Sequence, residues 1–193
     1  MKIIGFNGSP RINGSTAWAV GKILECAEGQ GTETEMFHAG SCNIGPCKGC
    51  LACTKTGRCA TDDGMQEIYA ALKGADALVL GAPVYMGQMS AQAKAFTDRL
   101  FAQITPRFSP HFKEENAGKK LALVFTQGNP DPGRFQAYYD YTKAMFGLLE
   151  FEVQEPLIIA DTRSEPASGQ DGLMAGLQAV SAMLCRSACA AAV

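Results

Sequence analysis

Four of the eight cysteines of this chain lie in one short segment, at Cys47, Cys50, Cys53 and Cys59. Two, two and five residues separate them, so three sulfurs share a tight loop and the fourth follows a turn at Gly57. A cubane 4Fe-4S cluster requires four thiolates brought together in this way. Structural zinc sites usually pair two short Cys-x-x-Cys hooks across a longer loop, which suits the evenly spaced triplet less well. An iron–sulfur cluster is the first interpretation, and unmetallated thiols and zinc remain open as the second and third.

The length of the chain favours one domain. With 193 residues, 47% of them hydrophobic, the chain can bury one substantial core, and no linker divides it. We therefore expect a single domain over residues 1–193, with a cysteine-rich loop inserted at about residues 42–61. The net charge of −2 provides no basic surface for nucleic acid, and the longest apolar runs have the length of a strand, not of a membrane span. Neither a nucleic-acid partner nor a membrane is expected.

The first residues bear on the cellular compartment. The sequence starts directly with a strand pattern and leaves no room for the apolar core and cleavage site of a signal peptide, so we expect a cytoplasmic protein. In a reducing compartment eight cysteines are not expected to form a disulfide framework. The clustered four are therefore expected to bind metal or to take part in redox chemistry.

Short apolar runs alternate with helical patterns along the chain. Strands are predicted at about residues 3–6, 32–38, 77–81, 121–126 and 151–160. Helices are predicted at about residues 15–28, 65–73, 90–101, 135–149 and 173–184. Such alternation produces a parallel sheet with right-handed crossovers. The order of elements predicts an α/β, flavodoxin-like fold, with five strands in the order 2-1-3-4-5, helices on both faces and the cysteine-rich loop after the second strand.

The loop after the first strand, residues 8–16, contains many groups that bind phosphate. It is neither a Walker A motif nor a Gly-x-Gly-x-x-Gly motif. It offers hydroxyls, an amide, a guanidinium and the free backbone N–H groups of a helix start, which suit a phosphate monoester. The residues concerned are Ser9, Arg11, Asn13, Gly14, Ser15 and Thr16. An ordinary capped loop is the alternative interpretation of the same serines and glycines.

Two further loops leave the same edge of the predicted sheet. Residues 83–90 combine an aromatic side chain, a glycine and exposed amides, which suit a flat ring system, although Tyr85 and Met86 also fit as anchors packed on the core. Thr126 and Gly128 stand in the turn after the fourth strand. In the order 2-1-3-4-5 the switch point lies between the first and third strands, so all three loops face one crevice. Together they could hold the phosphate, the ring and the pyrimidine edge of a mononucleotide.

With these motifs the chain resembles the NAD(P)H-dependent FMN reductase-like flavoproteins, specifically their iron–sulfur flavoprotein branch. The resemblance rests on Gly8-Ser-Pro-Arg, Gly14-Ser-Thr, the segment from Ala82 to Arg99 and the four-cysteine loop, and it extends to about residue 130. It implies that FMN is the cofactor and that its phosphate is held by Ser9, Arg11, Asn13, Gly14, Ser15 and Thr16. The isoalloxazine ring is implied to lie against Pro83, Val84, Tyr85, Met86 and Gly87. The implied ligands of a 4Fe-4S cluster are Cys47, Cys50, Cys53 and Cys59.

Two such cofactors predict a redox function. A flavin takes two electrons and passes them singly, while an iron–sulfur cluster takes one. We therefore expect an FMN-dependent oxidoreductase that passes electrons between a ferredoxin or NAD(P)H donor and an acceptor that the sequence does not identify. His38 falls in a strand pattern and His111 in an irregular loop, so both are interpreted as structural or solvated, and no catalytic side chain is predicted.

Two other functions fit the same residues. One is an NAD(P)H-dependent FMN or quinone reductase without a cluster, in which the cysteine loop is structural or binds zinc. The other is a non-catalytic electron carrier of the flavodoxin type, although the near-neutral charge argues weakly against its acidic docking face. The irregular residues 105–118 suit a lid or a subunit contact, and we expect a homodimer or homotetramer.

Overall fold

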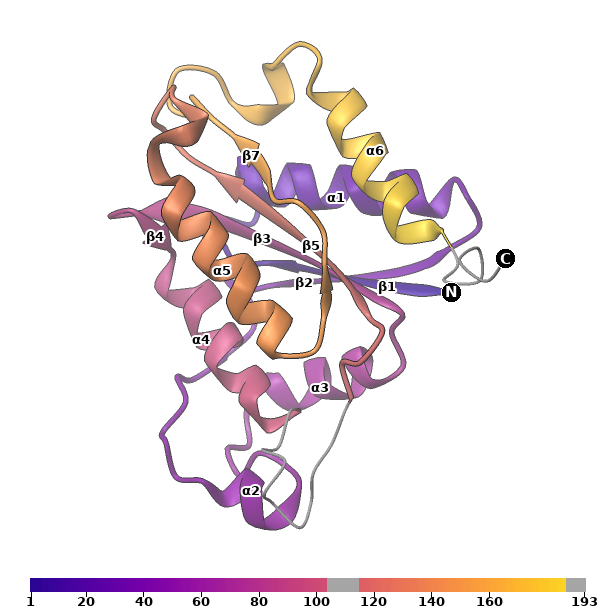
Figure 1. Ribbon diagram of the computed structural model, residues 1–193, viewed down its shortest axis with the longest axis vertical. Coiled ribbons are helices and arrows are strands. Elements are labelled where there is room, and N and C mark those ends of the chain that lie inside the picture. Colours follow the sequence, from indigo (N-terminus) through magenta and orange to yellow (C-terminus); the bar gives the residue numbers. More distant parts are fainter. Residues whose placement is uncertain (104–114, 187–193) are drawn as a thin grey trace.

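The computed structural model describes residues 1–103 and 115–186 (Figure 1). The strands are β1 (Lys2–Asn7), β2 (Glu33–His38), β3 (Ala77–Tyr85), β4 (Gln88–Met89), β5 (Lys120–Thr126), β6 (Glu152–Val153) and β7 (Leu157–Ile159). The helices are α1 (Ser15–Glu28), α2 (Ala52–Thr56), α3 (Met65–Lys73), α4 (Ala91–Arg99), α5 (Gln136–Leu148) and α6 (Leu173–Cys185). Three short 3-10 helices are η1 (Leu100–Ala102), η2 (Pro132–Phe135) and η3 (Ala167–Gly169).

The sheet confirms the predicted α/β fold and strand order. Its strands run in the order β2-β1-β3-β5-β6, with parallel pairing along this path, and β7 pairs with the other end of β5. The predicted last strand, residues 151–160, is therefore two short strands. Pro156 stands in the interruption between β6 and β7. Proline lacks the N–H that a ladder needs and restricts the residue before it, which explains the break.

The predicted loop at residues 83–90 is a β-hairpin. β3 continues to Tyr85, beyond the predicted end at residue 81, and pairs in antiparallel fashion with β4. Met86 and Gly87 form the turn, with φ angles of 52° and 82°. A two-residue turn in which both residues have positive φ is of type I′, which matches the twist of the flanking strands.

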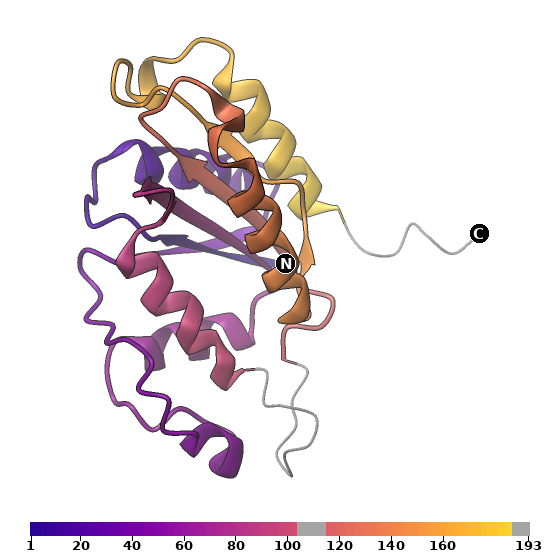
Figure 2. The ribbon, with the colours of Figure 1, turned by 60° about the vertical axis from the view of Figure 1, so that its left-hand side comes forward.

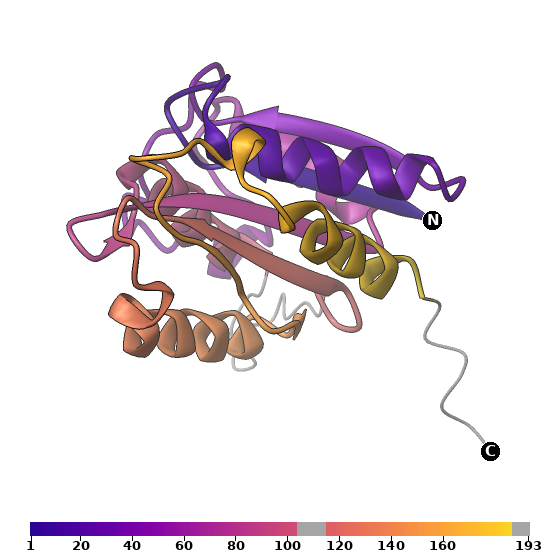
Figure 3. The same cartoon turned by 90° about the horizontal axis from the view of Figure 1, so that it is seen from above.

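Helices cover both faces of the sheet. α1 and α6 lie together on one face, and α3, α4 and α5 lie on the other (Figures 1 and 3). The alternation of side chains along β1 explains this arrangement: Ile3 belongs to the core under α1 and α6, whereas Ile4 and Phe6 belong to the core under the other three helices. A Cβ atom at Gly5 would lie only 2.7 Å from Leu24, so this glycine allows α1 to pack close to the strand.

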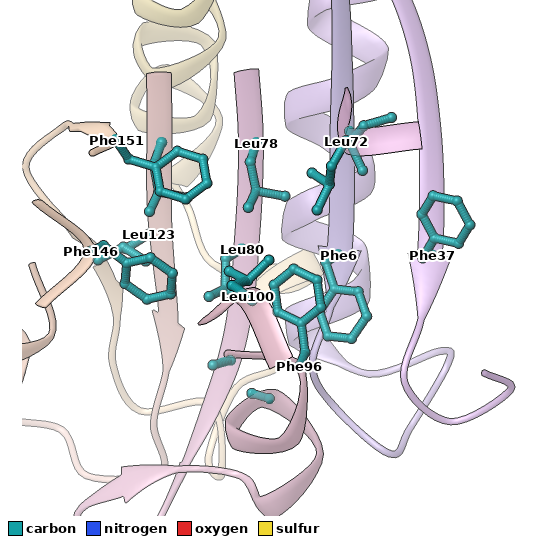
Figure 4. Close-up of a cluster of buried hydrophobic side chains, with 14 of the residues drawn as sticks. Phe6, Phe37, Leu72, Leu78, Leu80, Phe96, Leu100, Leu123, Phe146 and Phe151 are labelled. Atoms are coloured by element: carbon teal, nitrogen blue, oxygen red, sulfur yellow. The ribbon is translucent and has the colours of Figure 1, made fainter. Parts of the chain in front are cut away.

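The core on the α4 side is rich in aromatic rings (Figure 4). Phe6 and Phe96 are stacked with their ring centroids 4.0 Å apart, and both are fully buried. Such a pair contributes about 0.5–1.5 kcal/mol beyond its hydrophobic burial. This contact fixes α4 against β1, and the N-terminal end of α4 then lies beside the loop that follows β1.

The cysteine-rich part of the chain runs from the end of β2 to the start of α3. We call residues 39–64 the cysteine segment, and within it the chain forms only the short helix α2. α2 lies on the side of the molecule formed by α3 and α4, away from α1 and α6 (Figures 1 and 2). Of the predicted irregular segment, residues 105–114 lie outside the described residues, and residues 115–118 form a turn before β5. Within the described ranges, no helix combines the length and the apolar character needed to cross a membrane.

Candidate functional site

Asn7, the last residue of β1, shapes the first loop. Its side-chain Oδ1 accepts the N–H of Ser9 at 3.1 Å, and its Nδ2 donates to the carbonyl of Arg11 at 3.3 Å. The hydroxyl of Ser9 then accepts the N–H of Arg11 at 3.1 Å. Ser9 is thus buried and holds the loop in shape, whereas Arg11 is exposed. Asn7 was not predicted as a site residue, because its pattern is that of an ordinary strand end.

Hydrogen bonds join the loop after β1 to β3 and to the start of α4, the two elements on either side of the second predicted loop. Gly8 donates its N–H to the carbonyl of Gly81 at 2.7 Å, and the Ser90 hydroxyl donates to the carbonyl of Gly8 at 2.5 Å. A Cβ atom at Gly8 would lie 2.6 Å from the Cβ of Ala93, so only glycine fits here. Ser90 also caps α4 by accepting the N–H of Ala93. The predicted convergence of the first two loops is present.

The start of α1 is suited to an anion. Its N-cap residue is Gly14, which offers no side-chain cap, and the first turn contains no acidic residue. The first N–H groups of the helix therefore lack the usual side-chain acceptor, and the helix dipole adds partial positive charge. Arg11 and Asn13 are exposed beside this end. The arrangement matches what a phosphate monoester requires.

Two of the predicted phosphate residues also tie the loops together. The hydroxyls of Thr16 and Thr126 are 2.7 Å apart and hydrogen-bonded, which joins the first loop to the end of β5. The Ser15 hydroxyl accepts the N–H of Ala167 at 3.1 Å and retains its own hydrogen for another acceptor. Thr126 is thus brought to the first loop, as predicted.

Gln127 organises the third loop, and the sequence did not single it out. Its side-chain amide is 1% exposed and donates to the carbonyls of Asn129 and Asp131 at 3.0 and 2.7 Å. The hydroxyl of Tyr139 on α5 donates to the Oε1 of the same amide. A Cβ atom at Gly128 would lie 3.2 Å from the Cβ of Arg163, so the backbone passes close to the following loop there.

The hairpin of β3 and β4 presents its tip to solvent. Pro83 is buried and Val84 half-buried, while Tyr85 is 42% exposed and Met86 is fully exposed. A Cβ atom at Gly87 would lie 3.6 Å from the ring of Phe135, so the tip lies beside the end of η2, just before α5. Neither Tyr85 nor Met86 is packed on the core. The alternative interpretation of these two residues as core anchors is therefore wrong.

The four clustered cysteines line one pocket, which we call the cysteine pocket. Cys47 and Cys50 are exposed, and Cys53 and Cys59 are half-buried. Gly57 ends α2 with a φ of 71° and donates its N–H to the carbonyl of Cys53, which is the predicted turn before the fourth cysteine. Among the described residues no three histidine, cysteine or acidic side chains are arranged closely enough to hold a single metal ion.

An ion pair attaches the cysteine segment to α4. Arg99 donates to both carboxylate oxygens of Asp63, at 2.8 and 3.0 Å, and to the carbonyls of Gly45 and Thr61. Arg99 lines the cysteine pocket, and its Nε is buried without a hydrogen-bond partner in the described part of the chain. The pocket thus combines four thiol groups with a buried cation that has one unused donor, and these groups fit what an anionic thiolate-ligated cluster would need.

The surroundings of Cys53 and Cys59 differ. Burial raises the pKa of the Cys53 thiol, and the neighbouring cysteines Cys59 and Cys50 add to the increase. Burial also acts to raise the pKa of Cys59, but a backbone hydrogen bond at Thr61 and the positive charge of Arg99 outweigh it and lower that pKa. The protein therefore favours the thiolate form of Cys59 more than that of Cys53.

The sequence and the fold identify relatives of this chain. Residues 1–151 match the family of NADPH-dependent FMN reductases. An iron–sulfur flavoprotein of Methanosarcina thermophila is 42% identical over 99 residues, which is 51% of this chain and 52% of that protein. One of Archaeoglobus fulgidus is 40% identical over 121 residues, or 63% of this chain and 60% of the relative. The chain thus spans about half the length of the curated relatives it matches.

Solved structures share the fold at low sequence identity. An NADH:FMN oxidoreductase in its apo form has a TM-score of 0.67 and 19% identity, covering 95% of this chain and 87% of that one. An FMN-dependent NADH-azoreductase from Bacillus anthracis in complex with FMN has a TM-score of 0.65 and 14% identity, covering 96% and 99%. These structures confirm the predicted flavodoxin-like fold. The curated relatives confirm the predicted resemblance to the iron–sulfur flavoprotein branch. The chain belongs to the NADPH-dependent FMN reductase family.

Proposed function

We propose that this chain is an FMN-dependent oxidoreductase that also carries a 4Fe-4S cluster in the cysteine pocket. It passes electrons between a ferredoxin or NAD(P)H donor and a small-molecule or protein acceptor. Residues 1–193 act as one FMN-binding domain in which the cysteine segment is an insertion. The proposed compartment is the cytoplasm, and neither nucleic acid nor a membrane is a proposed partner.

The proposed FMN site lies at the carboxyl edge of the sheet. The uncapped start of α1, with Ser9, Arg11, Asn13, Gly14, Ser15 and Thr16, would hold the phosphate, and Ser9 also keeps the loop in the required shape. The exposed hairpin tip is the surface for the ring, through Pro83, Val84, Tyr85, Met86 and Gly87. Thr126 and Gly128 would contact the pyrimidine edge. What supports this assignment is that hydrogen bonds join the first loop to both the second and the third.

One observation carries the proposed cluster: Cys47, Cys50, Cys53 and Cys59 line the same pocket. The matched relatives named iron–sulfur flavoproteins support the same assignment. When bound, a flavin and a cluster together supply conversion between two-electron and one-electron transfer. The protein's own contribution is to position four thiolates, to place the charge of Arg99 beside them, and to fix the segment to α4.

Metal, sulfide and flavin analysis of anaerobically purified protein tests the proposal. We expect about four iron and four sulfide per chain, because a cubane with four cysteine ligands has that composition, together with one FMN. Mass analysis of the released flavin separates FMN from FAD. Reduction of the flavin is then followed with NADPH, NADH and reduced ferredoxin in turn. A protein that contains no flavin after reconstitution contradicts the proposed FMN site.

A second candidate is an NAD(P)H-dependent reductase with FMN alone. It is favoured by the matched family, whose description names FMN reduction with NADPH and no cluster. In this case anaerobic protein contains FMN and turns over with NAD(P)H but binds no iron. Zinc in place of iron would assign the cysteine segment to a structural role.

A further inference from the structure

Among the described residues that line the cysteine pocket, one charged side chain is buried. The charged residues of this lining are Lys48, Asp98 and Arg99. Lys48 is exposed, and the Asp98 side chain is 42% exposed and paired with Lys94, so water screens these two charges. The Arg99 side chain is only 1% exposed. A buried charge is screened much less, so the charge of Arg99 acts most strongly on a group bound in the pocket.

The ion pair of Arg99 and Asp63 has its positive partner on the side of the cysteines. Arg99 lines the cysteine pocket, whereas Asp63 is not among the described residues of its wall. Burial has the largest effect on the pKa of the Cys59 thiol, which it raises, but a backbone hydrogen bond at Thr61 and the charge of Arg99 outweigh it. The cation is therefore nearer to the cysteines than the carboxylate is, and the two charges do not cancel there.

Four hydrogen bonds hold the Arg99 guanidinium in place. Nη1 donates to Asp63 and to the carbonyl of Gly45, and Nη2 donates to Asp63 and to the carbonyl of Thr61. The Tyr69 hydroxyl donates to the backbone carbonyl of Arg99 at 2.6 Å, which fixes this end of α4 to α3. A buried ion pair is often no more stabilising than apolar side chains of the same volume, so stability alone does not account for this arginine.

We propose that Arg99 sets the reduction potential of the cluster bound in the cysteine pocket. Reduction transfers one electron from the donor to the cluster, which adds one negative charge and breaks no bond to a ligand. The buried positive charge stabilises the reduced form more than the oxidised form and so raises the potential. Asp63 offsets part of this effect. The inference rests on the proposed function, because it requires the cluster, and it deepens that function by assigning the control of the potential to one side chain.

Redox titration of the full chain, purified anaerobically and followed by electron paramagnetic resonance of the reduced cluster, tests the proposal. Asp63→Asn removes the offsetting negative charge and is expected to raise the potential. Adding Arg99→Gln to Asp63→Asn removes the positive charge as well, and is expected to lower the potential below that of Asp63→Asn. We expect each step to change the ratio of reduced to oxidised cluster at a fixed potential about tenfold, which is about 59 mV for a one-electron couple.

The control is Lys22→Gln on α1, which removes one positive charge on the opposite face of the sheet and leaves the potential unchanged. Iron and sulfide are determined on every sample, because a purely structural role lowers the iron content without shifting the potential in opposite directions. If the double variant holds no cluster, the shift in Asp63→Asn decides.

The outcomes separate this inference from the proposed function. An Asp63→Asn potential equal to or below that of wild type, or a double variant equal to Asp63→Asn, rejects the role of Arg99 and leaves the cluster in place. Loss of the cluster from both variants assigns the ion pair to the structure of the cysteine segment and also rejects the inference. Wild-type protein without iron and sulfide rejects the proposed cluster, and the inference with it.

Discussion

The guanidinium of Arg99 lies 2.8 and 3.0 Å from the two carboxylate oxygens of Asp63, and the side chains are 1% and 8% exposed. Arg99 belongs to α4 in the body of the fold, and Asp63 belongs to the cysteine segment. The carboxylate also accepts the N–H groups of Gly45 and Met65. One buried ion pair thus holds the two ends of the segment that carries the four clustered cysteines.

Arg99→Met is expected to release the cysteine segment. Removing one partner of a buried ion pair typically costs about 3–5 kcal/mol, because the other charge stays buried without compensation. Hydrogen exchange should accelerate in residues 42–64 while β1 and β3 remain protected. Arg99→Lys restores the charge without the bidentate geometry and should give an intermediate result. Exchange that stays slow in Arg99→Met would show that the ion pair does not anchor the segment.

Asp63 is expected to make the stability of the protein depend on pH. Burial acts to raise the pKa of its carboxyl group, but hydrogen bonds from Arg99, Gly45 and Met65 outweigh burial and hold the pKa below its usual range. A carboxylate with a lowered folded-state pKa stabilises the fold above the unfolded pKa, about 3.9, and this contribution is lost as the pH falls through the folded pKa. Urea unfolding should therefore show a stability difference between wild type and Asp63→Asn that is constant above about pH 5 and shrinks in stronger acid. A difference that does not change with pH contradicts this role.

The sequence predicts the order of the sheet well, because alternating strand and helix patterns leave few parallel topologies. The sequence predicts less well the ends of elements where two residue preferences conflict, and it does not predict contacts between distant residues. Pro83 normally argues against a strand, yet β3 continues through it to the turn at Met86 and Gly87. The pairing of Asp63 with Arg99 spans 36 positions and leaves no local pattern, since an aspartate before α3 resembles an ordinary helix cap.

Arg11 is expected to contribute to FMN affinity without contributing to the fold. Its side chain is exposed beside the uncapped start of α1, so Arg11→Gln should weaken FMN binding about tenfold, the loss expected for one hydrogen bond to a charged group. The melting temperature of the flavin-free protein should not change. Lys22→Gln, farther along α1, is the matched control and should retain wild-type affinity. Fluorescence titration of FMN measures both variants, and equal affinities would move the phosphate to another site.

The homodimer or homotetramer expected from the sequence is expected to use α5. Tyr141, Met145 and Leu148 are 62%, 37% and 72% exposed, and their spacing places them on one face of the helix. An apolar stripe of this kind favours burial against a second copy of the chain. Sedimentation should show a wild-type dimer or tetramer, which Tyr141→Glu with Leu148→Glu converts to a monomer. Met174→Glu, on α6, is the control; a wild-type monomer at micromolar concentration would remove the proposal.

The proposal that this chain binds both FMN and a 4Fe-4S cluster is tested most directly by Cys53→Ser, with Cys42→Ser as the control. Cys53 lines the cysteine pocket, whereas Cys42 is half-buried against the hydrophobic core and lies outside the pocket. The measurement is electron paramagnetic resonance of anaerobically purified, reduced protein, with iron and FMN content determined on the same samples. We expect wild type and Cys42→Ser to contain iron and to give a cluster signal, and Cys53→Ser to lose both while it retains FMN. A cluster signal that survives in Cys53→Ser, or wild-type protein that contains zinc or no metal, would contradict the account.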